Sequence, residues 1–299
     1  MTSVGVIAHE DKVLGRGFEE LRALLAAAGF ADPPWYEVPK SKKAPKKIRK
    51  LVEKDGVDRL LVWGGDGTVR RAIQTVLDAE LDHVSIGILP AGTANLLAKN
   101  LGIPIDLSRA LDIALHGDPR PLDVGCMNGE YFAVMGGAGY DAVMIRDAED
   151  NDLKERFGRA GYVWSSIRNT AISPTRAEVT VDGRPWFVGD ATCVMVANVG
   201  TILGGITAFP GASPCDGKLD VGVVQARSAG DWLGLAARAV VGRAELSPVV
   251  DTAAAERIEV SFVREMPWEV DGGDKDRTDT FTITCVPAAV HVCQPDGPR

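Results

Sequence analysis

The stretch that decides the fold is LLVWGGDGT, residues 60–68. Its first four residues are apolar and predict a buried strand, and a helical pattern follows from Val69. Gly64, Gly65 and Gly67 allow the backbone to turn sharply and to approach a ligand closely, while the start of a helix directs N–H groups toward it. The stretch matches neither the GxxxxGK(S/T) phosphate loop nor the GxGxxG dinucleotide fingerprint. It predicts a strand-to-helix turn that can hold an anion.

A second turn of the same kind follows the next expected strand. Residues 86–89 are apolar and lead into PAGTAN, residues 90–95, which opens another helix. Either turn alone could be only a tight connection between a strand and a helix. Two such turns on neighbouring strand ends predict one phosphate-binding crevice, with Thr68, Thr93 and Asn95 as neutral hydrogen-bond donors.

The first part of the chain, residues 3–122, alternates short apolar runs with helical patterns. We expect strands at 4–8, 35–38, 60–63 and 84–89, and helices at 18–28, 44–54, 69–77, 94–101 and 107–115. This alternation predicts an α/β fold with a parallel sheet and helices packed on its faces. Ligands of such sheets bind at the carboxyl ends of the strands.

After Leu122 the apolar pattern changes to a period of two. We expect strands at 177–181, 186–188, 192–197, 219–224, 258–263 and 280–286, with helical interludes at 146–168 and 231–243. This pattern predicts a mostly antiparallel β domain, a sandwich or a flattened barrel. We therefore expect an α/β domain at 1–122, to which a tail of about 286–299 can return, and a β-rich domain at 123–285.

Composition limits the class of protein. The chain has 299 residues, of which 45% are hydrophobic and 25% charged, so disorder, collagen and a coiled coil are excluded. We find no apolar run of membrane-spanning length and no secretion signal, which favours a cytoplasmic protein. The five cysteines and four histidines are dispersed, which favours reduced thiols over a disulfide framework or a zinc site. A net charge of −8 argues against a nucleic-acid partner.

One segment departs from this acidic balance. Residues 40–54 contain eight Lys or Arg and one acid, Glu53, a local charge of 8 − 1 = +7 that leaves −15 for the rest of the chain. One interpretation is the solvated face of a helix whose apolar stripe is Ile48, Leu51 and Val52. The other is attraction to anionic lipid or to nucleotide phosphate. The two interpretations are compatible, and the sequence leaves both open.

Four segments in a fixed order resemble a known family. They are GGDGT (64–68), LPAGTANLLA (89–98), SPCDGKLDVGVV (213–224) and EVDGG (269–273). Together they resemble the bacterial soluble lipid kinases of the diacylglycerol kinase catalytic-domain superfamily, over nearly the whole chain. GGDGT alone is also found in NAD kinases and phosphofructokinases. In an NAD kinase, however, we would expect Gly-Phe-Leu after the second strand, where LPAGTAN stands here.

The resemblance implies a site for ATP in the crevice between the two domains. It implies that Asp66 orients a catalytic Mg²⁺, and that a structural Mg²⁺ is held by Asp216 with the carbonyl groups of Ser213 and Lys218. It also implies that Asp271 is the general base for a lipid hydroxyl. The ATP-binding residues that it implies are Gly64, Gly65, Asp66, Gly67, Thr68, Val69, Arg70, Gly92, Thr93 and Asn95.

Three positions depart from the family pattern. The Asn-Pro-x-Ser-Gly turn after the first strand is missing, and Lys12, Gly15, Arg16 and Gly17 are candidates to replace it. The family's Asp-Gly-Glu is here Asp271, Gly272 and Gly273, so either Asp271 acts alone or Asp274 substitutes for the glutamate. The threonine expected after the 35–38 strand is also absent, although Ser41 is close.

These observations predict an ATP- and Mg²⁺-dependent kinase that phosphorylates a lipid hydroxyl, with diacylglycerol as the first candidate. We expect it to meet its substrate at an anionic membrane surface, and the resemblance also suggests a homodimer. Two alternatives stay open: a kinase for NAD or another small alcohol, and a non-catalytic sensor of nucleotide or lipid.

Overall fold

The computed structural model describes residues 2–139, 174–202 and 206–296. The chain divides into two compact units. Unit 1 contains Met1–Leu122 together with Ala288–Arg299, and unit 2 contains Asp123–Pro287. The helical interlude expected at 146–168 lies outside the described residues.

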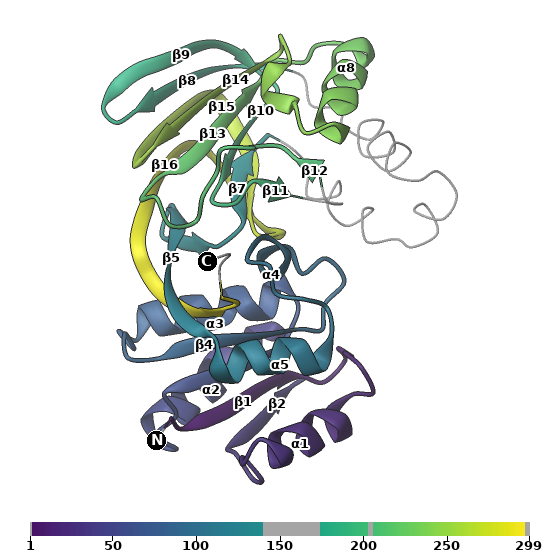
Figure 1. Cartoon of the computed structure of the whole chain (residues 1–299). Coiled ribbons are helices and arrows are strands. Elements are labelled where there is room, and N and C mark those ends of the chain that lie inside the picture. The colour runs from purple at the N-terminus through teal and green to yellow at the C-terminus, as the bar shows by residue number, and fades with distance from the viewer. Residues whose placement is uncertain (1, 140–173, 203–205, 297–299) are drawn as a thin grey trace. The chain divides into compact units, whose positions relative to one another are not determined.

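Unit 1 is built on a parallel sheet, as the sequence predicted (Figure 1). Its strands run in the order β2, β1, β3, β4, followed by the end of β16, and every neighbouring pair is parallel. The register pairs Gly64 of β3 with Pro90 of β4, so the two glycine turns begin side by side. The strand bounds are β1 Val4–His9, β2 Trp35–Val38, β3 Arg59–Gly64, β4 Ser85–Pro90 and β16 Gly273–Gln294.

Helices cover both faces of this sheet, with α2 and α3 on one face and α1 and α5 on the other (Figure 1). Most follow the expected ranges, but α3 begins at Asp66 and not at Val69, because Gly65 already takes the capping position. Helix α4 begins at Leu96, since Asn95 adopts a left-handed backbone (φ 49°) that no helix can include. The bounds are α1 Phe18–Ala27, η1 Ser41–Lys43, α2 Ala44–Glu53, α3 Asp66–Asp78, α4 Leu96–Asn100 and α5 Leu107–His116.

Unit 2 is an antiparallel β-sandwich, which confirms the second half of the predicted fold class. Its core contains Phe132, Val196, Val221, Ile258 and Phe281, each at most 1% exposed. One helix, α8, lies near the range predicted for the second helical interlude. The bounds are β5 Asp118–Met127, β6 Glu130–Phe132, β7 Met135–Ala138, β8 Thr175–Val181, β9 Arg184–Ala191, β10 Cys193–Ala197, β11 Thr201–Ile202, β12 Ile206–Thr207, β13 Leu219–Val224, α8 Ala229–Val240, η4 Ala244–Leu246, β14 Val250–Ala255 and β15 Arg257–Val270.

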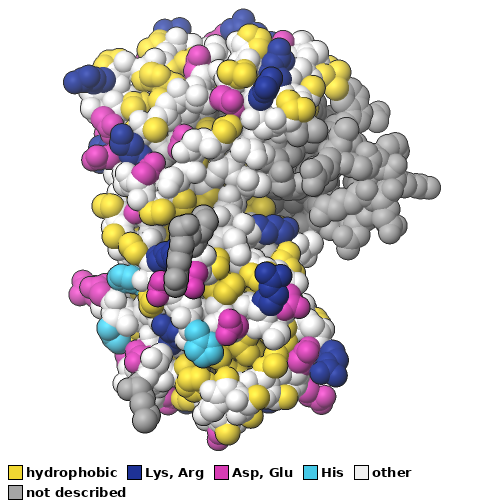
Figure 2. Space-filling view, in the orientation of Figure 1, with side chains coloured by type: hydrophobic (Ala, Val, Ile, Leu, Met, Phe, Trp, Pro, Cys, Tyr) yellow, Lys and Arg dark blue, Asp and Glu magenta, His cyan; other side chains and the backbone are white. Residues whose placement is uncertain are grey.

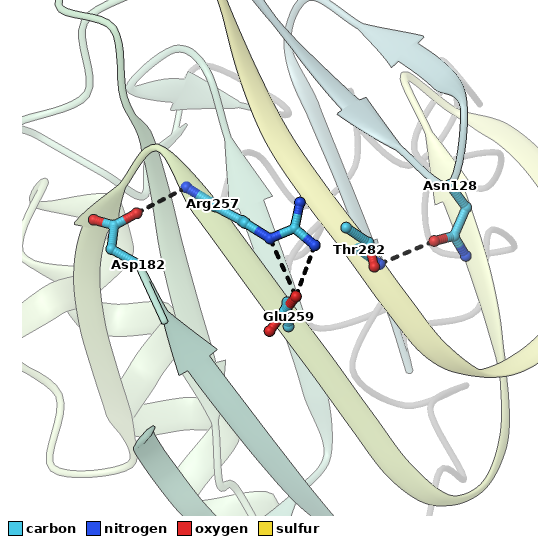
Figure 3. Close-up of polar contacts among 5 residues, drawn as sticks. All are labelled: Asn128, Asp182, Arg257, Glu259 and Thr282. Carbon is cyan, nitrogen blue, oxygen red and sulfur yellow. Dashed lines mark hydrogen bonds and ion pairs between the residues drawn. The ribbon is translucent and has the colours of Figure 1, made fainter. Parts of the chain in front are cut away.

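Polar side chains at turn tips fasten the hairpins of unit 2 to neighbouring strands (Figure 3). Asp182, in the β8–β9 turn, accepts hydrogen bonds from the backbone N–H groups of Glu256 (3.1 Å) and Arg257 (2.9 Å). Asn128, in the β5–β6 turn, accepts from the N–H of Thr282 at 2.9 Å. These bonds join segments that are far apart in the sequence, so each turn contacts a strand outside its own hairpin.

Among the residues that the structure describes, no helix is both long enough and apolar enough to cross a membrane.

Candidate active site

The two glycine turns of unit 1 pack backbone against backbone. The N–H of Ala91 donates to the carbonyl oxygen of Gly64 at 2.9 Å, which continues the β3–β4 pairing into the turns. A Cβ atom built on Gly92 would lie 2.3 Å from the Cα of Gly65. Real Cβ atoms do not approach backbone so closely, so only glycine fits at position 92 without a backbone shift. The turns predicted separately from sequence therefore form one structure.

Asp66 joins the first turn to the helix that follows the second. Its Oδ1 accepts a hydrogen bond from the N–H of Leu97, in the first turn of α4, at 3.2 Å. Burial raises the pKa of the Asp66 carboxyl, and hydrogen bonds from backbone N–H groups, including that of Leu97, partly offset the rise. The carboxylate thus holds the start of α4 against the start of α3.

Asn95 shapes the second turn from within. Its side-chain NH₂ donates to the carbonyl oxygens of Pro90 (3.2 Å) and Gly92 (2.7 Å), and its Oδ1 accepts from the N–H of Gly92 at 2.9 Å. Both amide hydrogens are therefore used inside the loop, and the side chain is only 3% exposed. The side-chain donors of Asn95 therefore fix the loop that carries Thr93, and its predicted contact with phosphate stays a prediction.

The other predicted ATP-binding residues of the two turns differ in their exposure to solvent. The Thr68 hydroxyl is buried and lies 3.0 Å from the hydroxyl oxygen of Ser41, in η1. Val69 and Arg70 are also buried, at 4% and 5% exposure. Gly67 and Thr93 are exposed, whereas Gly65, Asp66 and Gly92 are half-buried, so solvent most readily reaches the backbone of Gly67 and Thr93 and the Thr93 hydroxyl. Thr68 and Ser41 form a supporting layer behind them.

The loop after β1 is held by hydrogen bonds and an ion pair. The indole N–H of Trp63 donates to the carbonyl oxygen of Lys12 at 2.9 Å. Arg16 is an exposed partner of Glu20, at 3.6 Å between Nε and Oε1. Gly15 and Gly17 have φ angles of 57° and 87°, which explains the glycines. Of the four residues considered as replacements for the missing family turn, two are thus explained by backbone geometry.

In unit 2, Asp271 lies at the tip of the β15–β16 hairpin. Its carboxylate accepts three backbone hydrogen bonds: Oδ2 from the N–H of Ala133 at 2.8 Å, and Oδ1 from those of Val134 and Met135 at 3.0 Å each. The N–H of Asp271 donates in turn to the carbonyl oxygen of Met135 at 2.8 Å. Three hydrogen bonds therefore fix the orientation of this carboxylate, and a fourth fixes the backbone of Asp271.

Two further acids lie close to Asp271 in the same hairpin. Asp274 pairs through its backbone with Glu269 in the β15–β16 register, while its side chain lies outside the described part of the structure. Glu269 is only 1% exposed, and the sequence patterns did not predict it as a site residue. The sequence did contain a signal for it. Glu269 stands two residues before Asp271, and residues two apart in a strand lie on the same face.

The turn that contains Ser213, Asp216 and Lys218 is shaped by carboxylates. Asp216 is exposed, and its Oδ1 accepts from the N–H of Lys218 at 3.0 Å. Asp123, which sequence reasoning missed, is buried and its Oδ2 accepts from the N–H of Gly217 at 2.7 Å. Burial, and then the charge of Asp216, raise the pKa of Asp220 to about 6.

This turn suits a hard cation. Among the described residues, no group of three or more His, Cys, Asp or Glu side chains could hold a metal ion, so a site here would need backbone carbonyl groups. Oxygen ligands of that kind suit Mg²⁺. A divalent cation would also relieve the repulsion between Asp216 and Asp220. The residues present therefore fit the implied structural Mg²⁺.

The fold and these turns define a class of protein: an α/β unit with paired glycine turns, in one chain with an antiparallel β-sandwich. The diacylglycerol kinase catalytic domain matches residues 12–127, and the YegS C-terminal NAD kinase beta sandwich-like domain matches residues 134–294. The chain belongs to the family that combines these two domains. The resemblance stated from the four sequence segments is thus confirmed.

Relatives and solved structures agree with this assignment. A diacylglycerol kinase of Bacillus subtilis is 28% identical over 72% of this chain and 71% of its own length, and lipid kinase YegS of Escherichia coli K12 is 28% identical over 82% and 81%. A diacylglycerol kinase structure from Bacillus anthracis has a TM-score of 0.72 at 22% identity, covering 98% of this chain and 97% of the other. An NAD kinase from Archaeoglobus fulgidus in complex with ATP has a TM-score of 0.53 at 11% identity, covering 97% and 93%. The two structures show the shared fold, and the predicted enzyme class, a phosphotransferase, is confirmed by membership of this kinase family.

Proposed function

We propose that this protein is an ATP-dependent lipid kinase that transfers the γ-phosphoryl group to the hydroxyl of a membrane lipid, with diacylglycerol as the first candidate. The observation that carries the proposal is the backbone contact between Gly65 and Gly92, which joins two phosphate-type turns at the carboxyl edge of a parallel sheet. Relatives named diacylglycerol kinase and lipid kinase support the choice of a lipid acceptor.

We assign the phosphates of ATP to the exposed backbone of the two turns. Gly67 and Thr93 are the exposed members, and Gly67 lies in the first turn of α3, where the helix dipole favours an anion. Thr68, Asn95 and Arg70 are buried, so we assign them to holding these turns in shape. Positioning of this kind is the larger part of what phosphoryl transfer requires from a protein.

Asp66 would orient a catalytic Mg²⁺ near these phosphates, and Ser213, Asp216 and Lys218 would hold a structural one. When bound, Mg²⁺ neutralises the charge that develops on the transferred phosphoryl group. Asp66 fits an indirect role, since one of its oxygens already accepts the N–H of Leu97. What the protein itself contributes is a carboxylate, that of Asp66, held in a fixed place at the start of α3.

We assign the acceptor hydroxyl to Asp271 of unit 2. The hydroxyl oxygen forms the bond to the γ-phosphorus, the bond from that phosphorus to the β–γ bridging oxygen breaks, and ADP leaves while the hydroxyl proton passes to the carboxylate. Three N–H donors hold this carboxylate still, which favours orienting the hydroxyl over removing its proton early. In a loose transition state the acceptor hydroxyl needs little early deprotonation, so a carboxylate that mainly orients the hydroxyl suits the reaction. Asp274 is the second candidate for contact with the hydroxyl, in place of the family's glutamate.

The test is a phosphate-transfer screen with the purified full-length chain, γ-labelled ATP and Mg²⁺. The acceptors are diacylglycerol, a sphingoid base, NAD and glycerol, with the lipids presented in vesicles. We expect label in phosphatidic acid. Label in NADP alone would assign the protein to small-alcohol kinases, and ATP binding without transfer to any acceptor would assign it to nucleotide sensors.

A further inference from the structure

The basic segment around α2 carries eight basic side chains and one acid, Glu53, so most of its positive charge is not balanced within residues 40–54. We name the surface of these eight basic side chains the basic strip; they are Lys40, Lys42, Lys43, Lys46, Lys47, Arg49, Lys50 and Lys54. All are exposed except the half-buried Lys47. Within the described residues, no strip side chain lies within 4.0 Å of a carboxylate. The strip is therefore available to an external anion.

The apolar side of α2 explains the helix but not its charge. Ala44, Ile48, Leu51 and Val52 are buried, so the helix packs on unit 1 through a stripe that needs no lysine opposite it. Lys47 and Lys50 do have a partner, since their Nζ atoms lie 5.1 and 4.6 Å from the centre of the Tyr36 ring. Asp55, just after the strip, accepts the Tyr36 hydroxyl at 2.9 Å. In the part of the chain that the structure describes, the other six basic side chains have no such contact.

The charges at the start of α2 are unfavourable for the helix. Its first turn contains no acidic residue, and the capping residue Lys43 makes no side-chain hydrogen bond, so positive charge stands at the positive end of the helix dipole. Lys46 and Lys50, and Lys50 and Lys54, are like charges four residues apart, a spacing that destabilises a helix. Glu53 offsets part of this charge, four residues after Arg49 and three after Lys50, and the helix dipole favours Lys50 and Lys54 at the C-terminal end. The excess of positive charge at the start of the helix is left, and an anionic partner would favour it.

The strip begins beside the first glycine turn. Ser41, between Lys40 and Lys42, lies 3.0 Å from Thr68 through their hydroxyl oxygens. A Cβ atom on the exposed Gly67 would lie 3.8 Å from the Oγ of Ser41. A surface bound to the strip would therefore lie next to the turn to which we assign the phosphates of ATP. On the face of the molecule shown in Figure 2, by contrast, basic and acidic side chains are interspersed.

We propose that the basic strip docks on an anionic membrane surface and thereby presents the Gly64–Thr68 turn to the lipid phase. The proposal rests on the proposed function, because a lipid kinase must meet its acceptor at a membrane. Anionic lipid is preferred to nucleic acid as the partner, because the proposed acceptor is a membrane lipid and the strip contacts a single aromatic ring, that of Tyr36, whereas single-stranded nucleic acid is bound on several stacking aromatic side chains. The attraction per basic residue near an anionic leaflet adds up along the strip and is weakened by salt.

The test measures binding of the full-length protein to vesicles without ATP. Vesicles of phosphatidylcholine with one third phosphatidylglycerol are compared with vesicles of phosphatidylcholine alone, by co-sedimentation. The variant replaces three exposed strip residues that make no contact with the glycine turns, Lys46→Gln, Arg49→Gln and Lys54→Gln. The matched control removes the same charge from three exposed arginines elsewhere, Arg109→Gln, Arg176→Gln and Arg184→Gln.

We expect the wild-type protein to prefer the anionic vesicles, and the strip variant to lose on the order of a hundredfold in partitioning, while the control changes by a few-fold at most. The strip variant should unfold at the same temperature or a higher one, since like-charge repulsion is relieved. Equal loss in both variants, no preference of the wild type for anionic vesicles, or tighter binding to an RNA oligonucleotide than to vesicles would overturn the proposal.

A second readout separates this proposal from the proposed function. With a short-chain diacylglycerol dispersed below its aggregation limit, the strip variant should keep wild-type turnover, and with vesicle substrate it should lose most of it. Absence of transfer by the wild type with intact vesicle binding would reject the kinase function and leave docking in place. Equal turnover of variant and wild type on vesicles would reject docking and leave the kinase function in place.

Discussion

Two turns of unit 2 have the same backbone and different surroundings. Asp182–Gly183 and Asp271–Gly272 both adopt the left-handed region, with φ angles of 49° and 75° in the first turn and 46° and 75° in the second. Each aspartate accepts N–H groups of a distant segment. The difference lies in those N–H groups: Glu256 and Arg257 are exposed, whereas Ala133, Val134 and Met135 are at most 4% exposed.

The two turns have similar φ angles, so the shape of the turn does not distinguish the candidate site. The burial of the N–H groups that the aspartate accepts does distinguish it. Water can replace Asp182 as an acceptor for exposed N–H groups, whereas the N–H groups that Asp271 accepts belong to buried residues, which water reaches less readily. The glycine turns of unit 1 follow the same rule, because Gly65 and Asp66 matter through the second turn that they hold in place. The free energies of unfolding of matched pairs of variants test this distinction.

The largest difference in stability should separate Asp271→Ala from Asp182→Ala. The first leaves three buried N–H groups without an acceptor, and each costs about 1–3 kcal/mol, so we expect a loss of roughly 3 kcal/mol or more in the free energy of unfolding. The second exposes its N–H groups to water and should cost about 1 kcal/mol or less. Urea denaturation of both variants measures the difference, and equal losses would remove the distinction between the two turns.

In unit 1, we expect Gly92→Ala to destabilise the protein by about 1–3 kcal/mol, because the new methyl group overlaps the backbone of Gly65. Gly67→Ala is the matched control. Its Cβ meets only the Ser41 Oγ, at 3.8 Å, and alanine favours the helix that contains it. We expect Gly67→Ala to leave stability unchanged or raised. A tolerated Gly92→Ala would mean that the two turns do not form one unit.

Asp66 should show its burial in a pH series. Because its pKa is raised in the folded state, the charged carboxylate destabilises the fold progressively as pH rises from 3.8 through the raised pKa. Asp66→Asn removes that charge, and the variant's stability relative to the parent should be higher at pH 7 than at pH 3. Denaturation midpoints at the two pH values test the sign, and a relative stability that falls with rising pH would contradict burial as the dominant cause.

The smallest effect is expected behind the first turn. Ser41→Ala removes the contact with the Thr68 hydroxyl and should cost about 1 kcal/mol. Ser108→Ala, at an exposed position of α5, should stay within about 0.5 kcal/mol of the parent. If thermal unfolding does not separate these two variants, Ser41 does not support the turn.

How far the sequence could predict this structure differs between the units. In unit 1, strands such as 35–38 and 60–63 and the two glycine turns were predictable, because strand, turn and helix are local and parallel pairing brings their ends together. The predicted start of α4, residue 94, was wrong, because Asn95 adopts a left-handed backbone while its side chain hydrogen-bonds to Pro90 and Gly92.

In unit 2 the decisive contacts are not local. The hydrogen bonds from Ala133, Val134 and Met135 to Asp271 span more than a hundred residues, and no period in the sequence reports them. Strand β7 was missed because its sequence, MGGA, has no alternation of apolar and polar residues. The Asp-Gly pair at 271 resembled a plain hairpin turn, and only the resemblance to a family distinguished it from the pair at 182.

The central claim, that Asp271 serves the acceptor hydroxyl while the glycine turns hold ATP, is tested most directly by Asp271→Asn with Asp182→Asn as its control. Both are measured for binding of a non-hydrolysable ATP analogue and for transfer of labelled phosphate to diacylglycerol in vesicles. We predict that Asp271→Asn binds the analogue as the parent does and loses transfer by about a hundredfold to ten-thousandfold, while Asp182→Asn keeps both. Undiminished transfer by Asp271→Asn, or an equal loss in Asp182→Asn, would contradict the account.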